Sequence, residues 1–197
     1  LSSIIQYSGK GYPETQANDR RQVRSTSSPK WLAAVGRSVS TTSATTQEQC
    51  SLSIVTDTPG KDGIIAVTAG HCVDHWYQGD GSFNIGKNKT VFTTNSGKKI
   101  ERTIVEVLKA ELHIGDYAIV KLNAPIKNTD IKPLLNAPYD YADLLDKEIF
   151  HKPYATFAGY SADKGIGRKG KVLTYHERCQ VNGGASGKKK GYCYSYQ

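Results

Sequence analysis

Residues 64–73 read IIAVTAGHCV. A run of apolar residues, typical of a buried strand, ends at Thr-Ala-Gly, and His71 then stands beside Cys72. The histidine is either a packing residue that caps the strand or a base held at the edge of a β-sheet. The rest of the sequence has to distinguish these two interpretations.

Composition favours a β-rich globular protein. The chain has 197 residues, 38% of them hydrophobic, with 12 tyrosines and 19 glycines. It has no run of 18 apolar residues, so we expect no membrane span. The net charge of +8 comes from lysines spread along the chain, whereas a nucleic-acid interface would need a larger basic stripe with interleaved aromatic residues. We therefore expect no nucleic-acid partner.

Short apolar segments recur at intervals of roughly ten residues, separated by turns rich in Gly, Pro, Asn and Asp, which is typical of an all-β sandwich or barrel. After a polar arm, we expect strands over 31–39, 50–56, 64–70, two strands within 90–110 joined at Asn95-Ser96-Gly97, and then strands over 115–122, 154–160, 170–181 and 191–197.

The cysteine count and the absence of methionine indicate a processed, exported protein. Four cysteines are an even number, and a translated chain would begin with methionine. Together these features predict an oxidising compartment and two disulfides, with three pairings open. The cysteines form no Cys-x-x-Cys pair, and His75, His113, His151 and His176 show no metal-ligand spacing, so we expect neither a metal nor a cofactor.

A second motif completes a chemical pair with His71. Residues 115–122 read GDYAIVKL, so Asp116 precedes an alternating strand. A serine hydroxyl becomes a good nucleophile only when a base such as imidazole takes its proton, and a carboxylate must hold that imidazole in the right tautomer. The chain order of His71 before Asp116 is one of the orders found in serine-protease triads.

These motifs resemble the chymotrypsin/trypsin-like serine peptidases. VTAGHCV is close to the VTAAHC motif of that family, with Gly70 in place of its second alanine, and GDYAIVKL is similar to the segment around its catalytic aspartate. FAGYSADKG, residues 157–165, resembles the Gly-Tyr-Pro-Gly stretch of the bacterial glutamyl-endopeptidase-like branch, with Ser161 where proline is usual. The resemblance covers roughly residues 29–197.

The resemblance implies an all-β fold of two six-stranded antiparallel β-barrels with a cleft between them. It implies disulfides Cys50–Cys72 and Cys179–Cys193, with His71 as general base and Asp116 as its orienting carboxylate. The expected organisation is an arm over 1–30, a first barrel over 31–125, a linker over 126–144, and the first part of a second barrel over 145–197.

The nucleophile motif of the family is absent from these residues. Gly184-Ala185-Ser186-Gly187 comes nearest, but Lys188-Lys189-Lys190 follow where an apolar strand is needed. About 90 residues separate the aspartate from the serine in the family, whereas Ser186 lies 70 beyond Asp116. We expect the serine, the oxyanion hole and the S1 pocket on a C-terminal segment, so that the second barrel is incomplete here. Ser186 is the alternative nucleophile.

Two functions from different classes follow. The first is a secreted or periplasmic serine endopeptidase, proteolytically processed, that hydrolyses polypeptides through an acyl-enzyme and whose partner is a C-terminal chain of the same precursor. The second is a catalytically inactive homologue that binds anionic surfaces or glycans. A Gly-x-Ser-Gly-x-Pro motif in the precursor would support the enzyme. The presence of both His71 and Asp116 favours it, because a lost activity gives no reason to keep both.

Overall fold

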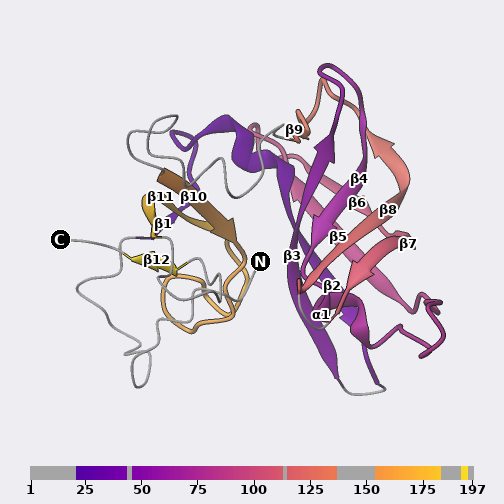
Figure 1. Ribbon diagram of the computed structural model, residues 1–197. Coiled ribbons are helices and arrows are strands. Elements are labelled where there is room, and N and C mark those ends of the chain that lie inside the picture. The colour runs from indigo at the N-terminus through magenta and orange to yellow at the C-terminus, as the bar shows by residue number, and fades with distance from the viewer. Residues whose placement is uncertain (1–20, 44–45, 113–114, 137–153, 183–191, 195–197) are drawn as a thin grey trace. The chain divides into compact units, whose positions relative to one another are not determined.

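The computed structural model describes residues 21–43, 46–112, 115–136, 154–182 and 192–194 (Figure 1). These residues belong to two compact units. The first unit contains residues 24–136, and the second contains residues 21–23 together with the part of the chain that follows 136.

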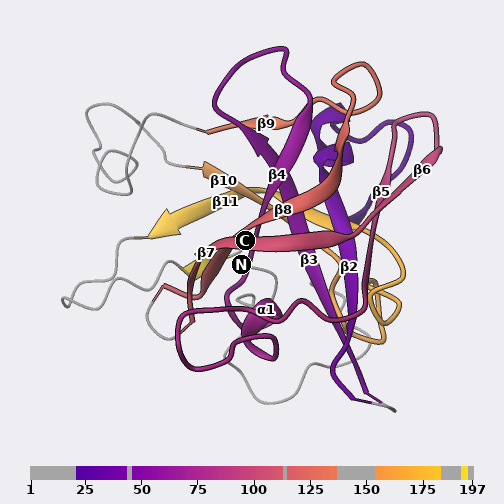
Figure 2. The same ribbon diagram turned by 90° about the vertical axis from the view of Figure 1, so that its right-hand side faces the viewer.

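The first unit is a single curled sheet with two short helical turns (Figure 2). The sheet order is β6-β5-β2-β3-β4-β8-β7, antiparallel throughout, and β9 adds a parallel pairing to the end of β3. The elements are η1 (Lys30–Ala34), β2 (Val35–Thr41), β3 (Gln47–Thr56), β4 (Gly63–Thr68), α1 (His71–Asp74), β5 (Asn88–Thr93), β6 (Lys99–Arg102), β7 (Ile104–Glu111), β8 (Tyr117–Ile126) and β9 (Leu134–Leu135).

The core of this unit lies inside the curl of the sheet. Successive side chains of a strand point to opposite faces, so alternate residues such as Ala118, Val120 and Leu122 of β8 are buried. Phe92 is completely buried against β2, and a Cβ atom at Gly36 would lie 2.6 Å from its ring. Glycine at position 36 therefore makes room for the largest fully buried side chain of the core.

A side-chain amide joins β5 to β7 where the sheet curls round on itself. The Asn88 side chain accepts a hydrogen bond from the Ile104 N–H at 2.7 Å and donates one to the Ile104 carbonyl at 3.0 Å. It also donates to the Gly86 carbonyl at 3.0 Å. Asn88 thus offers Ile104 one donor and one acceptor, as the backbone of a paired strand would. In the sheet order β5 and β7 are not adjacent, because β2, β3, β4 and β8 lie between them.

Two details of the first unit differ from the strands expected from sequence. Residues 31–34 form a 3₁₀ turn instead of a strand, because Pro29 has φ −51° and its carbonyl accepts the Leu32 N–H at 3.1 Å. The stretch 90–110 contains three strands instead of two, since the chain turns at Thr103. There the Asn123 side chain accepts a hydrogen bond from the Thr103 N–H, and the Asn123 N–H donates one to the Thr103 carbonyl.

The second unit contains a smaller antiparallel sheet. Its strands are β1 (Gln22–Val23), β10 (Tyr154–Gly159), β11 (Thr174–Asn182) and β12 (Tyr192–Tyr194), with β10 on one side of β11 and both β1 and β12 pairing with β11. Residues 22–23 of the expected arm are therefore part of a sheet.

An ion pair fixes the loop between β10 and β11 to the start of the described chain. Arg21 donates to the Asp163 carboxylate at 2.8 Å, and only 5% and 14% of the two side chains are exposed. Burial by itself raises the pKa of Asp163, but hydrogen bonds from Ser161, Arg21 and the Gly167 N–H outweigh it, so the pKa lies below its ordinary value. The carboxylate is therefore held in its charged form.

The predicted all-β class is confirmed. The described part of the chain has one sheet in each unit, and its helices are limited to one 3₁₀ turn and one four-residue α-turn. Among these residues no helix has the length and apolar character that crossing a bilayer requires. The larger sheet has eight strands, whereas six are expected in the first barrel. The two additional strands are the short β6 and the two-residue β9.

Replacing Asn88 by alanine tests the amide bridge. The variant leaves the Ile104 N–H and carbonyl without their partner, so we expect a loss of about 1–3 kcal/mol in the free energy of unfolding, measured by urea denaturation. The control is Asn128→Ala, whose exposed side chain makes one long contact of 3.4 Å to the Lys61 carbonyl and should matter by less than about 0.5 kcal/mol. Equal effects of the two substitutions would contradict the bridging role of Asn88.

Candidate active site

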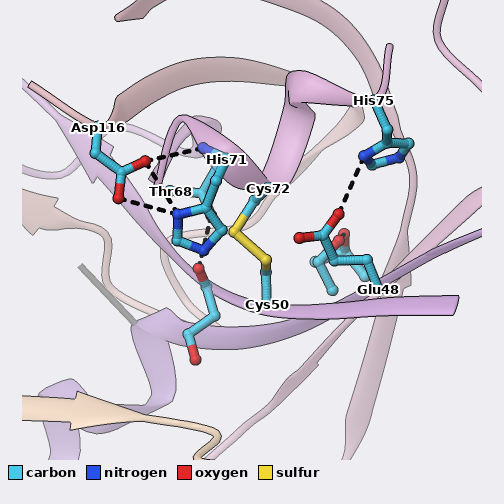
Figure 3. The surroundings of a disulfide bond; sticks show 10 residues. Glu48, Cys50, Thr68, His71, Cys72, His75 and Asp116 are labelled. Carbon is cyan, nitrogen blue, oxygen red and sulfur yellow. Dashed lines mark hydrogen bonds and ion pairs between the residues drawn. A yellow bond between two sulfur atoms is a disulfide. The ribbon is translucent and has the colours of Figure 1, made fainter. Parts of the chain in front are cut away.

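The stretch that carries His71 leaves the sheet directly after β4. Thr68, the last residue of β4, pairs with Leu52, and its buried hydroxyl donates to the Ser51 carbonyl at 2.8 Å, which extends the β3–β4 contact by one more bond (Figure 3). The chain then turns into α1, where the Cys72 N–H bonds to the Ala69 carbonyl at 3.2 Å. His71 is thus the first residue of a short turn on a fixed strand end.

Asp116 reaches the same place from the neighbouring strand. β4 and β8 are antiparallel partners, and Thr68 at the end of β4 lies opposite Ala118 near the start of β8. The residues that follow β4 and precede β8 are therefore brought together at one edge of the sheet. Asp116 has φ +44°, a left-handed conformation that aspartate tolerates better than most residues. This conformation occurs at the turn into β8.

The Asp116 carboxylate holds His71 at both its ring and its backbone (Figure 3). One oxygen, Oδ1, accepts the His71 backbone N–H at 2.9 Å and lies 3.0 Å from the ring atom Nδ1. The second oxygen, Oδ2, lies 2.9 Å from the same Nδ1. The His71 side chain is 41% exposed and that of Asp116 is 30% exposed. The carboxylate therefore fixes the ring without enclosing it.

The environment of Asp116 keeps it ionised. Burial taken alone raises the pKa of this carboxyl group, but the His71 backbone N–H and the His71 ring together outweigh burial and bring the pKa below its ordinary value. An ionised carboxylate can only accept hydrogen bonds, so it selects the imidazole tautomer with the proton on Nδ1. The other nitrogen, Nε2, is then left with a lone pair that can accept a proton.

A disulfide pins the residue next to the histidine. Cys50 of β3 is bonded to Cys72 of α1, with their Cα atoms 6.1 Å apart, so the predicted pairing is confirmed. Both residues are buried with Ala69 in a small apolar cluster beside the turn. The bond therefore ties the turn that begins with His71 to a central strand of the sheet.

A second histidine lies next to this cluster but serves a different contact. Nδ1 of His75 is 3.1 Å from Oε2 of Glu48, close enough for an ion pair although the angles do not make a hydrogen bond (Figure 3). His75 is mostly buried and ends the turn that His71 begins. Sequence reasoning did not identify Glu48, because a single glutamate in a polar stretch of sequence carries no signal of its partner.

The geometry does not offer a metal site at this edge. Cys50, His71 and Cys72 place their donor atoms within 4.8 Å of one another, but the two sulfurs are bonded to each other. Metals bind the cysteine thiolate, so neither sulfur is an available ligand. Of the remaining histidines, His176 is buried on β11 of the second unit, whereas His113 and His151 lie outside the described residues.

The other predicted site residues are not described in the structure. Ser186 lies outside the described residues, and so do the side chains of Cys179 and Cys193. The backbone places Cys179 on β11 and Cys193 on β12, which are neighbouring strands. The expected Cys179–Cys193 disulfide remains a prediction.

Replacing both Cys50 and Cys72 by alanine should destabilise the protein by about 3 kcal/mol, because the bond closes a loop of 22 residues in the unfolded chain. Urea denaturation with and without dithiothreitol measures this. Wild type should become less stable when reduced, and any reductant effect that persists in the double variant belongs to Cys179 and Cys193. A loss below about 1 kcal/mol would show that the sheet holds the turn without the bond.

Asp116 should contribute stability that depends on pH. Its pKa is lower in the folded state than in the unfolded chain, so the contribution is fully present above about pH 4 and disappears as pH falls through the lowered folded-state value. We expect the difference in free energy of unfolding between wild type and Asp116→Asn to be largest near neutral pH and to shrink below about pH 4. A difference that grows on acidification would contradict the hydrogen bonding described above.

Comparisons with known proteins give a match in structure and none in sequence. No family model matches the chain, and no curated protein matches its sequence. Among solved structures, the protease Anisep from Arthrobacter nicotinovorans matches with a TM-score of 0.52 and 14% identity over 84% of this chain and 69% of that one. The thermostable serine protease AL20 from an extremophilic microorganism matches with a TM-score of 0.52 and 16% identity, over 82% and 71% respectively.

Identities this low establish the fold alone. The expected resemblance is confirmed at that level, because these two matching structures are a protease and a serine protease and the observed sheets agree with an incomplete double barrel. The chain therefore has the chymotrypsin-like serine-protease fold.

Proposed function

We propose that this protein is a secreted serine endopeptidase, in which His71 is the general base and Asp116 the residue that orients it. The observation that carries the proposal is the contact of both Asp116 oxygens with Nδ1 of His71. The proposal puts the nucleophilic serine outside residues 1–197, since the roughly 90 residues between aspartate and serine in the family that this chain resembles correspond to a position near 206. No cofactor enters the reaction.

The proposed chemistry uses both ring nitrogens of His71 and the carboxylate of Asp116. Nε2 of His71 takes the proton from the serine hydroxyl as its oxygen attacks the carbonyl carbon of the scissile peptide bond. The imidazolium then gives that proton to the departing amine, and a water molecule repeats the sequence to release the acyl group. Asp116 remains ionised throughout, because it holds the Nδ1 proton and stabilises the charge on the ring.

The exposure of His71 supports this role. With 41% of its side chain exposed, the ring is accessible from solvent while its Nδ1 side is occupied by Asp116. A histidine that only packed a strand end would have both nitrogens used or covered. The arrangement therefore favours a proton-transfer role over the packing role that the sequence left open.

The disulfide supports export from the cytosol. Cys50–Cys72 joins two buried residues, and such structural disulfides persist in oxidising compartments. The substrate class proposed is polypeptide, in keeping with the protease fold.

A fluorophosphonate probe tests the nucleophile in the protein as its gene encodes it. Such probes label an activated serine, so labelling of a serine outside residues 1–197 is the expected result. Labelling of Ser186 would overturn the assignment of the nucleophile. Failure to label any serine would overturn the enzyme proposal and favour the inactive homologue that binds anionic surfaces or glycans.

Substitutions of two histidines separate catalysis from structure. We expect His71→Ala to lower kcat/KM for peptide hydrolysis by roughly 10⁴-fold or more, since the base is lost. His75→Ala is the matched control, four residues along the same turn and paired with Glu48, and should leave kcat/KM within about threefold. Comparable losses in both variants would argue that the turn, and not the imidazole of His71, is what activity requires.

A further inference from the structure

Gly70 stands immediately before His71, and its backbone conformation does not call for glycine. Its φ and ψ are −61° and −43°, right-handed helical values that any L-residue adopts readily. The usual reason for glycine, a positive φ, is therefore missing. Another property of glycine, its lack of a side chain, must account for its place here.

A side chain at position 70 has no room. An ideal Cβ atom built on Gly70 would lie 2.5 Å from the Glu111 carbonyl oxygen, 3.2 Å from the Tyr117 nitrogen and 3.3 Å from the Asp116 carbonyl carbon. All three neighbours are backbone atoms, so none can rotate away as a flexible side chain would. A contact of 2.5 Å requires that one of the two segments move.

The segment that presses on Gly70 is the end of the β7–β8 hairpin. Glu111, the last residue of β7, lies opposite Tyr117, the first residue of β8, and Asp116 immediately precedes Tyr117. The Glu111 carbonyl and the Asp116 backbone thus move together as one strand end. Any displacement of this end relative to Gly70 alters the distance between the Asp116 carboxylate and His71, the residue next to Gly70.

We propose that Gly70 is a positioning residue for the His71–Asp116 pair. The absence of a Cβ lets the end of the β7–β8 hairpin approach the turn before His71, and this approach sets the carboxylate at 2.9–3.0 Å from Nδ1. The inference deepens the proposed function and rests on it for its catalytic consequence. Its structural content, the dependence of the pair on Gly70, stands without it.

An alanine at position 70 should separate the pair. Relieving the overlap with the Glu111 carbonyl takes at least about 0.5 Å of movement, from 2.5 Å to the shortest separation that real Cβ atoms show. Two hydrogen bonds near 3 Å do not survive a shift of that size without weakening. Position 70 therefore governs the tautomer of His71 through Asp116, without itself touching the reacting groups.

The test is a nuclear magnetic resonance measurement on the protein as its gene encodes it, with ¹⁵N-labelled histidine. In wild type we expect a slowly exchanging Nδ1 proton on His71 and ring ¹⁵N shifts of the Nδ1–H tautomer. Gly70→Ala should lose the proton signal and give mixed tautomers. The matched control is Gly63→Ala at the first residue of β4, the strand that leads to Gly70. There a Cβ would meet side-chain atoms of Pro133 at 2.9 Å and of Ile54 at 3.2 Å, and the His71 signal should persist.

A coupled variant keeps the proposal testable if Gly70→Ala does not fold. Two glycines inserted after Leu112 lengthen the connection to Asp116 and free the Glu111 carbonyl to move back. In that background Gly70→Ala should cause no further loss of stability or of the His71 signal, because the two changes act on one contact. Additive losses would overturn the proposal, as would an unaltered His71 signal in Gly70→Ala alone.

Activity provides an independent readout. In the complete protein, Gly70→Ala should lower kcat roughly 10²-fold with KM within about twofold of wild type, since a misplaced base acts only on the chemical steps. If the protein proves not to be a protease, this arm fails while the resonance arm still decides the role of Gly70. If the protease is active and kcat is unchanged, the positioning role is overturned.

Discussion

The antiparallel pairing of β4 with β8 is the interaction on which the candidate site depends. Its register sets Thr68 opposite Ala118, so the chain leaving β4 and the chain entering β8 meet at one sheet edge. His71 and Asp116 are 45 residues apart in sequence and become neighbours through this pairing. A one-residue slip would turn every side chain of one strand to the other face, so the buried alternation of Ala118, Val120 and Leu122 that fixes the register also fixes the site.

The pair also reflects a balance of opposing effects on one carboxylate. Partial burial of Asp116 works against its charge, while the backbone N–H and ring of His71 favour it, and the second effect prevails. The same hydrogen bonds that keep the group ionised define which imidazole nitrogen carries the proton. Ionisation and orientation are therefore one property of the geometry, and a change that weakens the contact alters both.

Sequence reasoning found the parts of the site that are encoded by short motifs. His71 and Asp116 follow from residue types in local motifs, the Cys50–Cys72 pairing follows from the family resemblance of those motifs, and the structure brings all four residues together. It did not identify Asn88, because the side chain of Asn88 is hydrogen-bonded to the backbone of Ile104, which lies on a strand that is not its neighbour in the sheet order. The break at Thr103 was missed for the same reason, since its partner Asn123 lies on β8. Contacts between a side chain and a distant backbone leave no periodic signal.

The glycine at position 70, where the family motif has alanine, is explained by a segment that is distant in the sequence. The motif that VTAGHCV resembles has alanine at this position, and the helical φ and ψ of Gly70 would accept one. The reason for glycine lies at Glu111, 41 residues further along, whose carbonyl occupies the space of a Cβ. The pair, the disulfide and this contact all lie within the first unit. The orientation of the His71 ring is therefore set by one sheet and its turns, and in the proposed reaction the tautomer of the imidazole is determined before a nucleophile reaches Nε2.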